Sequence, residues 1–200
     1  MNKILILFAH PRFEHSVANQ YLIKAAKQNP NVTFHDLYEH YPNFDIDVKH
    51  EKELLLSHDV IIWQHPFYWY SCPPLLKQWI DLVLEFNWAY GPKGNALAGK
   101  YVFSVLTTGG ASDAYQPEGR NRFSLKQFLT PFIQTAFLCK MKYLAPFAVQ
   151  GTHRLLPDDL ENYARDYAKL LNYLAEADSL SDELEHVELL NDFIKELNNN

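Results

Sequence analysis

The sequence predicts an α/β protein: a doubly wound, five-stranded parallel sheet with helices on both faces. Short apolar runs, typical of strands buried on both faces, alternate along the chain with stretches whose apolar residues recur every three or four positions. This alternation of strand and helix is typical of a parallel sheet. The clearest pair is the apolar run 60–63 and, after Pro73 and Pro74, an amphipathic helix whose apolar stripe extends over 75–83.

The first part of the chain predicts two further strands and two helices. We expect a strand over 4–8, a helix over 17–25 and a second strand over 32–37. An irregular stretch over 38–47 and a short helix over 49–57 follow. Ser16 directly precedes the first helix and is a good amino-terminal cap for it. The short helix leads into the central strand at Val60.

The second part predicts two more strands. A long connection over 87–99 leads to a strand over 101–106, and a polar loop then extends to Arg122. Residues 124–140 have a helical pattern that Pro131 should interrupt. The last strand is expected over 143–149, where Pro146 is best tolerated near a sheet edge. Pro157 begins a long helix.

We expect one flavin-binding domain over residues 1–177 and an acidic helical appendage over 178–200. No repeat or low-complexity linker divides the chain. Within the appendage, a helix over 181–197 would place Leu184, Val187, Leu190 and Ile194 on one face.

Composition excludes several classes of protein. The net charge of −6, without a basic cluster, argues against a nucleic-acid partner. Two cysteines cannot form a disulfide framework, which favours a reducing compartment. The apolar run at the amino terminus is too short for a signal peptide or membrane span, and none follows. We therefore expect a cytoplasmic protein.

Three strand ends should meet at one edge of this sheet, where open α/β sheets bind ligands. The first supplies His10 and the start of a helix, with Ser16, Val17, Ala18 and Asn19. A helix amino terminus offers free N–H groups and a positive dipole end, which suit a phosphate. Taken alone, Ser16 is equally well explained as a helix cap.

The loop after the central strand is crowded with aromatic residues. It contains Pro66, Phe67, Tyr68, Trp69 and Tyr70, where ordinary loops carry turn residues. We interpret it as a platform for a flat aromatic ligand, and packing against a neighbouring subunit is the alternative.

The loop after the fourth strand reads Thr107, Thr108, Gly109, Gly110 and Ala111. Adjacent glycines let the backbone come close to the edge of a planar ligand. A phosphate site, an aromatic wall and a glycine edge are together what a flavin mononucleotide needs.

Other chemistries find no support in the sequence. There is no dinucleotide fingerprint, Walker pattern or nucleophile elbow. No metal-ligand spacing appears, so no metal is expected, and the histidines at 35, 40, 50, 58, 153 and 186 look scattered and solvated.

Several motifs together resemble one family. They are, in order, Ala9-His10-Pro11, Ser16-Val17-Ala18-Asn19, the stretch from Trp63 to Ser71, Pro73-Pro74-Leu75-Leu76-Lys77, Trp88-Ala89-Tyr90-Gly91, Thr107-Thr108-Gly109-Gly110 and Pro146-Phe147. The chain resembles the flavodoxin-like NAD(P)H:quinone oxidoreductases. It is especially similar to the short bacterial branch that serves as ancillary subunit of glutathione-gated potassium efflux systems.

The resemblance implies a flavodoxin-like fold, a homodimer and a non-covalent flavin that takes hydride from NADH or NADPH. Short members look like FMN enzymes, whereas longer mammalian relatives use FAD, so FMN is expected. Trp88 and Tyr90 would reach the partner's pocket, and Tyr115 would be the catalytic tyrosine in its own subunit. The family pairs that tyrosine with a histidine, but residues 120–122 are Arg-Asn-Arg here.

The leading hypothesis is FMN-dependent hydride transfer from NAD(P)H to quinones. The alternatives are a regulatory ancillary subunit of a potassium-efflux membrane protein, peripheral at the inner face of the membrane, and a flavodoxin-type electron carrier. The carrier is disfavoured because the threonine-rich phosphate loop typical of flavodoxins is missing.

Overall fold

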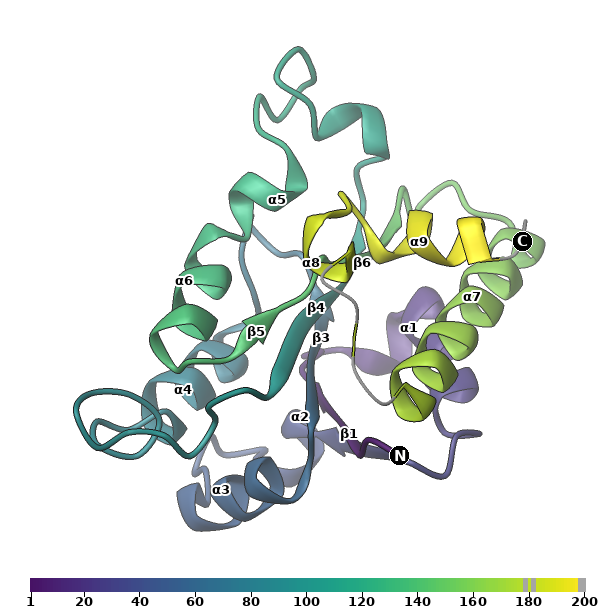
Figure 1. The fold of residues 1–200 in the computed structure, drawn as a ribbon. Coiled ribbons are helices and arrows are strands. Elements are labelled where there is room, and N and C mark those ends of the chain that lie inside the picture. The colour runs from purple at the N-terminus through teal and green to yellow at the C-terminus, as the bar shows by residue number, and fades with distance from the viewer. Residues whose placement is uncertain (178–179, 181–182, 198–200) are drawn as a thin grey trace.

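The computed structural model describes residues 1–177, 180 and 183–197, and its centre is a six-stranded parallel sheet (Figure 1). The strands are β1 Ile4–Phe8, β2 Val32–Asp36, β3 Val60–Pro66, β4 Tyr101–Thr108, β5 Lys142–Tyr143 and β6 Phe147–Gln150. Their order is β2-β1-β3-β4-β5, and β6 also pairs with β4. The predicted fold class is confirmed.

Helices cover both faces of the sheet. The helices are α1 Val17–Ala26, α2 Leu37–His40, α3 Val48–Ser57, α4 Pro74–Val83, α5 Leu125–Phe128, α6 Thr130–Leu138, α7 Pro157–Glu176, α8 Glu183–His186 and α9 Leu190–Leu197. Alternate residues of β1 enter different cores: Leu5 and Leu7 face the side of α4 and α6, whereas Ile4 and Ile6 face the side of α1 and α7. The period of two along each strand produces this division.

Prolines account for two interruptions of the predicted pattern. The helical stretch over 124–140 breaks before Pro131 into α5 and α6, as expected. The last strand, expected as one element over 143–149, is instead the pair β5 and β6, separated by residues 144–146. Pro146 has no N–H to donate, so the ladder cannot continue through it.

The segment expected to be irregular over 38–47 begins with helix α2. Asp36 caps this helix, because its carboxylate accepts hydrogen bonds from the N–H groups of Tyr38 at 3.0 Å and Glu39 at 3.3 Å. The sequence carried the signal in the form of an aspartate at the end of a strand.

The carboxyl-terminal segment packs on the edge of the sheet. The helix predicted over 181–197 is wrong, because the described part of this range forms two helices, α8 and α9; residues 178–179, 181–182 and 198–200 lie outside the described residues. Leu184, Leu190, Phe193 and Ile194 are buried in the core on the α7 side. The division of the chain at residue 177 stays a prediction.

Within the described residues, no helix combines the length and the apolar character that a membrane crossing would require.

Candidate functional site

The register of the sheet brings four loops to its carboxyl-terminal edge. Phe8 of β1 lies beside Gln64 of β3, and Pro66 of β3 lies beside Thr107 of β4. Thr108 of β4 in turn lies beside Gln150 of β6. The three predicted loops therefore meet, and the loop after β6 joins them.

Ser16 occupies the amino-terminal cap position of α1 but does not cap the helix through its side chain. The plain-cap interpretation of Ser16 is therefore wrong. Its hydroxyl instead accepts a hydrogen bond from Asn19 Nδ2 at 2.9 Å, which leaves the O–H free to donate. Val17, Ala18 and Asn19 occupy the first turn, where N–H groups have no acceptor within the helix. This end of α1 therefore presents donors suited to an anion.

Asn19 is fully buried and holds the first loop against the neighbouring strands. Its Nδ2 also donates to Thr107 Oγ1 at 3.2 Å, and its Oδ1 accepts from Gln64 Nε2 at 3.0 Å. Gln64 Oε1 accepts from the Tyr167 hydroxyl at 3.1 Å. Because both hydrogens of its amide are already donated, Asn19 positions Ser16 rather than offering a side-chain donor of its own.

His10 is buried at the start of the first loop. Its Nδ1 accepts a hydrogen bond from the Arg12 N–H at 3.1 Å, so the neutral ring carries its hydrogen on Nε2. Burial lowers the pKa of His10, and the carboxylate of Glu14 partly opposes this effect. The ring packs edge-on against Tyr68, with 6.0 Å between centroids. His10 therefore links the first loop to the aromatic loop as a neutral donor.

The aromatic loop is a tight turn with a strained tip. Tyr68 and Ser71 form an antiparallel bridge around Trp69 and Tyr70, whose φ angles are 49° and 63°. Two consecutive left-handed residues are typical of a turn in which Asn and Gly are preferred. Bulky residues in this conformation cost about 1–3 kcal/mol each and cluster at functional sites.

The side chains of this loop are unevenly covered. Trp69 is 90% exposed, whereas Phe67 is buried and packs on Tyr115 with 6.0 Å between ring centroids. Pro66 ends β3, and the Phe67 N–H donates to Thr107 O at 2.9 Å, which ties the loop to the end of β4. The exposed indole gives the edge of the site an unpartnered aromatic surface.

A different ring crowds the position that a side chain would occupy at each glycine of the pair, while Gly109 is exposed and Gly110 is partly exposed. A methyl group at Gly110 would lie 3.2 Å from the Tyr115 ring, and one at Gly109 would lie 2.8 Å from His153 Nε2. Thr108 Oγ1 donates to Gly110 O at 2.7 Å and so fixes the turn. Burial raises the pKa of Tyr115, and a hydrogen bond with Thr108 partly opposes this, so the Tyr115 hydroxyl keeps its proton at neutral pH.

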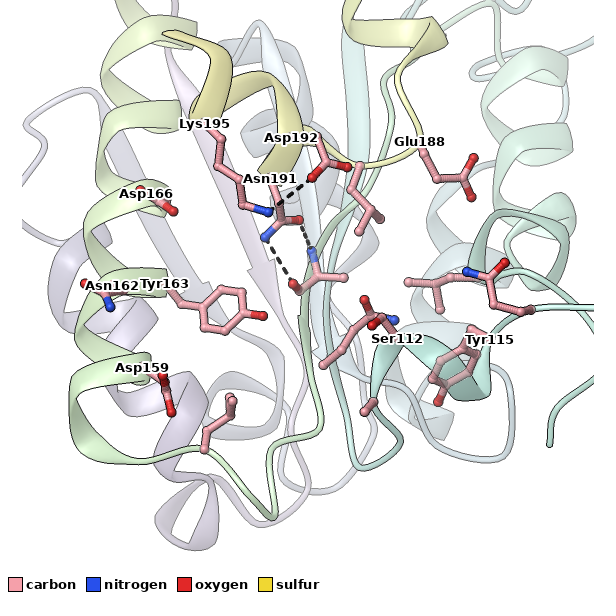
Figure 2. A pocket seen from close by; sticks show the side chains of 17 residues that line it. Ser112, Tyr115, Asp159, Asn162, Tyr163, Asp166, Glu188, Asn191, Asp192 and Lys195 are labelled. Atoms are coloured by element: carbon pink, nitrogen blue, oxygen red, sulfur yellow. Dashed lines mark hydrogen bonds and ion pairs between the residues drawn. The ribbon is translucent and has the colours of Figure 1, made fainter. Parts of the chain in front are cut away.

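Three cavities adjoin this edge. One of about 310 Å³ lies between the aromatic loop and Tyr115, and one of about 670 Å³ lies on the other side of Gly110, against Ala111 and His153. A third, of about 590 Å³, is enclosed by α7, α9 and the loop after β4 (Figure 2). Tyr163 of α7 points into this third cavity, across from Tyr115.

Trp88 and Tyr90 lie away from these loops within the subunit. They belong to the connection between α4 and the start of β4, at the opposite end of the sheet from α5 (Figure 1). Lys52 Nζ lies 4.7 Å from the centre of the Trp88 ring. The single chain therefore does not bring them into the site, and their contact with a partner's pocket stays a prediction.

Three of the histidines expected to be scattered are close together in space. His35 of β2, His50 of α3 and Glu51 of α3 have possible ligand atoms within 4.8 Å of one another, and the His40 ring lies 4.2 Å from that of His35. Glu51 is fully buried and already accepts hydrogen bonds from three side chains. These donors account for the buried carboxylate without a metal ion.

Sequence reasoning missed Gln64, Tyr167 and His153. Gln64 carried a signal, because a polar residue within the apolar run of β3 needs a buried partner. His153 lies just beyond the last predicted strand, at the same edge as the other loops. Nothing in the local pattern of α7 separates Tyr167 from the ordinary core residues of the helix stripe.

Comparison with known proteins gives a family and close relatives. A family profile described as "Flavodoxin-like fold" (Flavodoxin_2) matches residues 2–174. A relative from Pectobacterium carotovorum, named glutathione-regulated potassium-efflux system ancillary protein KefG, is 53% identical over 169 residues, which cover 84% of this chain and 92% of the relative.

Two solved structures are similar over most of the chain. General stress protein 14 from Treponema denticola, solved in complex with FMN, has 39% identity and a TM-score of 0.82 over 86% of this chain and 99% of that one. An NADPH-quinone reductase from P. pentosaceus has 34% identity and a TM-score of 0.78 over 88% of this chain and 99% of that one.

Proposed function

The chain belongs to the family of proteins with a flavodoxin-like fold, and we propose that it is an FMN-dependent oxidoreductase that transfers hydride from NAD(P)H to quinones. The observation that carries this proposal is the free donor set at the start of α1, which Asn19 and Thr107 tie to a glycine loop where Gly109 is exposed and Gly110 is partly exposed. A phosphate and a flat ring edge together match these two features. The complex of a 39% identical protein with FMN supports the choice of cofactor.

A bound flavin would supply hydride transfer between NAD(P)H and the quinone. Ser16 Oγ and the first N–H groups of α1 would hold its phosphate, and His10 would donate through Nε2 from the same loop. Thr107, which accepts from Asn19, ties the phosphate loop to the glycine loop. The N–H groups of Gly109, Gly110 and Ala111 would donate to the pyrimidine edge of the ring.

The aromatic loop and Tyr115 shape the other side of the proposed pocket. Phe67 to Tyr70 would line the ring of the cofactor, and the cavity of about 310 Å³ between this loop and Tyr115 would receive the quinone. Burial raises the pKa of Tyr115, so its hydroxyl is available as a proton donor to a quinone oxygen. In the proposed homodimer, Trp88 and Tyr90 of the partner chain complete this pocket.

The test is turnover of the FMN-loaded protein with NADH or NADPH and 1,4-benzoquinone. Tyr115→Phe should lower kcat by about 10- to 100-fold while FMN stays bound, because only the proton donor is lost. Tyr101→Phe, at the opposite end of β4, is the matched control. A loaded wild-type protein that leaves the quinone unreduced would refute the enzyme and favour an electron carrier.

A second candidate function is that of an ancillary subunit of a potassium-efflux membrane protein. The 53% identity to a KefG protein favours it specifically. The two functions are compatible, because an enzyme can also bind a membrane partner. Co-purification of a tagged chain with a potassium-efflux transporter from its own cells would establish the second role, and enzyme activity without co-purification would leave only the first.

A further inference from the structure

A chain of buried hydrogen bonds connects helix α7 with the start of α1. The Tyr167 hydroxyl donates to Gln64 Oε1 at 3.1 Å, and Gln64 Nε2 donates to Asn19 Oδ1 at 3.0 Å. Asn19 Nδ2 then donates to Ser16 Oγ at 2.9 Å and to Thr107 Oγ1 at 3.2 Å. The three donors Tyr167, Gln64 and Asn19 are fully buried. Because Ser16 is partly exposed, the chain leads from the core to the proposed phosphate site.

All the hydrogen bonds of this chain run in one direction, outward from Tyr167. A side-chain amide has a donor end and an acceptor end, so a reversed Asn19 would set its Nδ2 against Gln64 Nε2 unless Gln64 reversed as well. In the fully reversed chain the Ser16 hydroxyl would donate to Asn19 Oδ1 and turn its lone pairs toward the ligand. The observed direction leaves the Ser16 hydrogen free for an anion.

The Tyr167 hydroxyl fixes this direction at the buried end of the chain. Among the residues that the structure describes, Gln64 is its one hydrogen-bond partner. A reversed Gln64 would present its amide nitrogen to Tyr167, and the hydrogen of the Tyr167 hydroxyl would then have no acceptor. Since an unpaired donor in the core is costly, Tyr167 holds Gln64 in the observed orientation.

We propose that Tyr167 is a positioning residue for the phosphate of the flavin, an inference that rests on the proposed function. Tyr167 does not touch the ligand, because it is fully buried and its ring packs on Phe147 with 5.3 Å between centroids. It acts through the amides of Gln64 and Asn19, which keep the Ser16 hydrogen directed away from the core. Phosphate oxygens are acceptors, so this direction favours a phosphate monoester.

The test compares the binding of FMN with that of riboflavin, which lacks the phosphate, by calorimetric titration. The wild type should bind FMN more tightly. Tyr167→Phe keeps the ring that packs on Phe147, so the variant should fold, but it removes the hydrogen that orients Gln64. It should lower the preference for FMN about tenfold and leave the Kd for riboflavin unchanged.

Tyr173→Phe is the matched control. Tyr173 lies on the same helix and loses the same hydroxyl, but its ring packs on Phe193 of α9. The preference of this variant for FMN should equal that of the wild type.

A double variant shows whether Tyr167 acts through Ser16. In the Ser16→Ala background the hydroxyl that Tyr167 positions is absent, so Tyr167→Phe should change the Kd for FMN by less than twofold. Fully additive effects of the two substitutions would overturn this inference.

An unchanged preference for FMN in Tyr167→Phe would also overturn the inference and leave the proposed function intact. An equal loss of FMN and riboflavin binding would do the same, because the effect would then be a general loosening of the site. Wild-type protein that binds both flavins equally would overturn the inference together with the assigned phosphate site. Wild-type protein that binds neither would remove the proposed function itself.

Discussion

The side-chain amide of Asn191 pairs with both backbone groups of Ala148. Its Oδ1 accepts from the Ala148 N–H at 2.8 Å and its Nδ2 donates to Ala148 O at 3.1 Å (Figure 2). The Ala145 N–H donates to Leu184 O at 2.8 Å, and the Leu190 N–H donates to Pro146 O at 2.9 Å. The carboxyl-terminal segment thus covers Ala148 of the edge strand β6 and the connection before it, which would otherwise be open to unwanted pairing.

Asn191→Ala should lower the free energy of unfolding by about 1–3 kcal/mol, because it leaves two buried backbone groups of Ala148 unpaired. Urea unfolding monitored by circular dichroism measures this. Asp192→Ala is the control, since it removes only an exposed ion pair with Lys195 and should cost less than about 1 kcal/mol. Equal stability of the two variants would show that the hydrogen bonds between Asn191 and Ala148 contribute nothing to the stability.

Glu51→Gln should be among the most destabilising single changes in the chain. Glu51 accepts hydrogen bonds from His35 Nε2 at 2.7 Å, the Tyr41 hydroxyl at 2.5 Å and Trp79 Nε1 at 2.7 Å. Burial by itself would raise the pKa of Glu51, but these three donors lower it overall, so the carboxylate is ionised. An amide in its place turns an acceptor into a donor that faces other donors.

We expect Glu51→Gln to lower the free energy of unfolding by about 3 kcal/mol or more, measured by denaturant unfolding. Glu53→Gln, on the exposed side of the same helix, should change it by less than about 0.5 kcal/mol. If Glu51→Gln were as mild as its control, the buried network would not support the fold.

Substitutions of Ser16 and Asn19 should distinguish an effect on FMN binding from an effect on the stability of the fold. Ser16→Ala should raise the Kd for FMN about 10- to 100-fold, because one charge-assisted hydrogen bond is lost. Its free energy of unfolding should fall by only about 1 kcal/mol, because Ser16 does not cap α1 and Asn19 Nδ2 keeps one of its two acceptors. Asn19→Ala should weaken FMN binding and also lower the free energy of unfolding by about 1–3 kcal/mol, since it leaves the buried Gln64 Nε2 without its acceptor.

Calorimetric titration with FMN and thermal unfolding of the apoprotein measure these two effects. Gln20→Ala, on the exposed face of α1, is the control for both. A Ser16→Ala variant that loses stability but binds FMN normally would contradict the assigned role of Ser16.

Stability should fall on mild acidification because of His65. Burial lowers the pKa of His65 to about 4, although a hydrogen bond to Pro66 O opposes this. Since the folded pKa lies below the unfolded value of about 6.5, the unfolded chain binds the proton more readily. The contribution of His65 to the free energy of unfolding is therefore complete above about pH 6.5. It falls as the pH is lowered toward 4, by about 3 kcal/mol in total.

The His65 ring stacks on Phe132, with 5.6 Å between the ring centroids. His65→Phe keeps a ring that can stack in this way but removes the group that binds the proton. Its free energy of unfolding should therefore depend less on pH between about 4 and 6.5 than that of the wild type. Parallel pH profiles for the two proteins would reject this explanation.

Local patterns were enough to predict most of the fold. Strands buried on both faces form continuous apolar runs, and Pro131 marked the break between α5 and α6. The prediction of one strand over 143–149 assumes that a sheet edge tolerates Pro146, but the missing N–H of this proline divides the strand in two. The helical periodicity over 181–197 did not reveal that Leu184 and Leu190 bond to the backbone of Ala145 and Pro146, or that the Asn191 side chain pairs with Ala148 of β6.

The loops of the site were predictable, but their geometry was not. Strand order alone sends His10, Phe67 and Gly109 to one edge. Two long-range relationships help to decide what those residues do: Asn19 with Gln64, and His153 against Gly109. Both depend on pairing between distant segments, which spacing along the chain does not encode. The left-handed turn at Trp69 is local, but bulky residues do not predict it.

The most direct measurement of the central claim is the binding of FMN to the purified apoprotein, followed by calorimetry and by the change in the flavin absorption spectrum. We expect each chain to have a single FMN site, which binds FMN more tightly than FAD and which Ser16→Ala weakens. Binding of neither flavin, or equal binding of FMN by the wild type and Ser16→Ala, would contradict it.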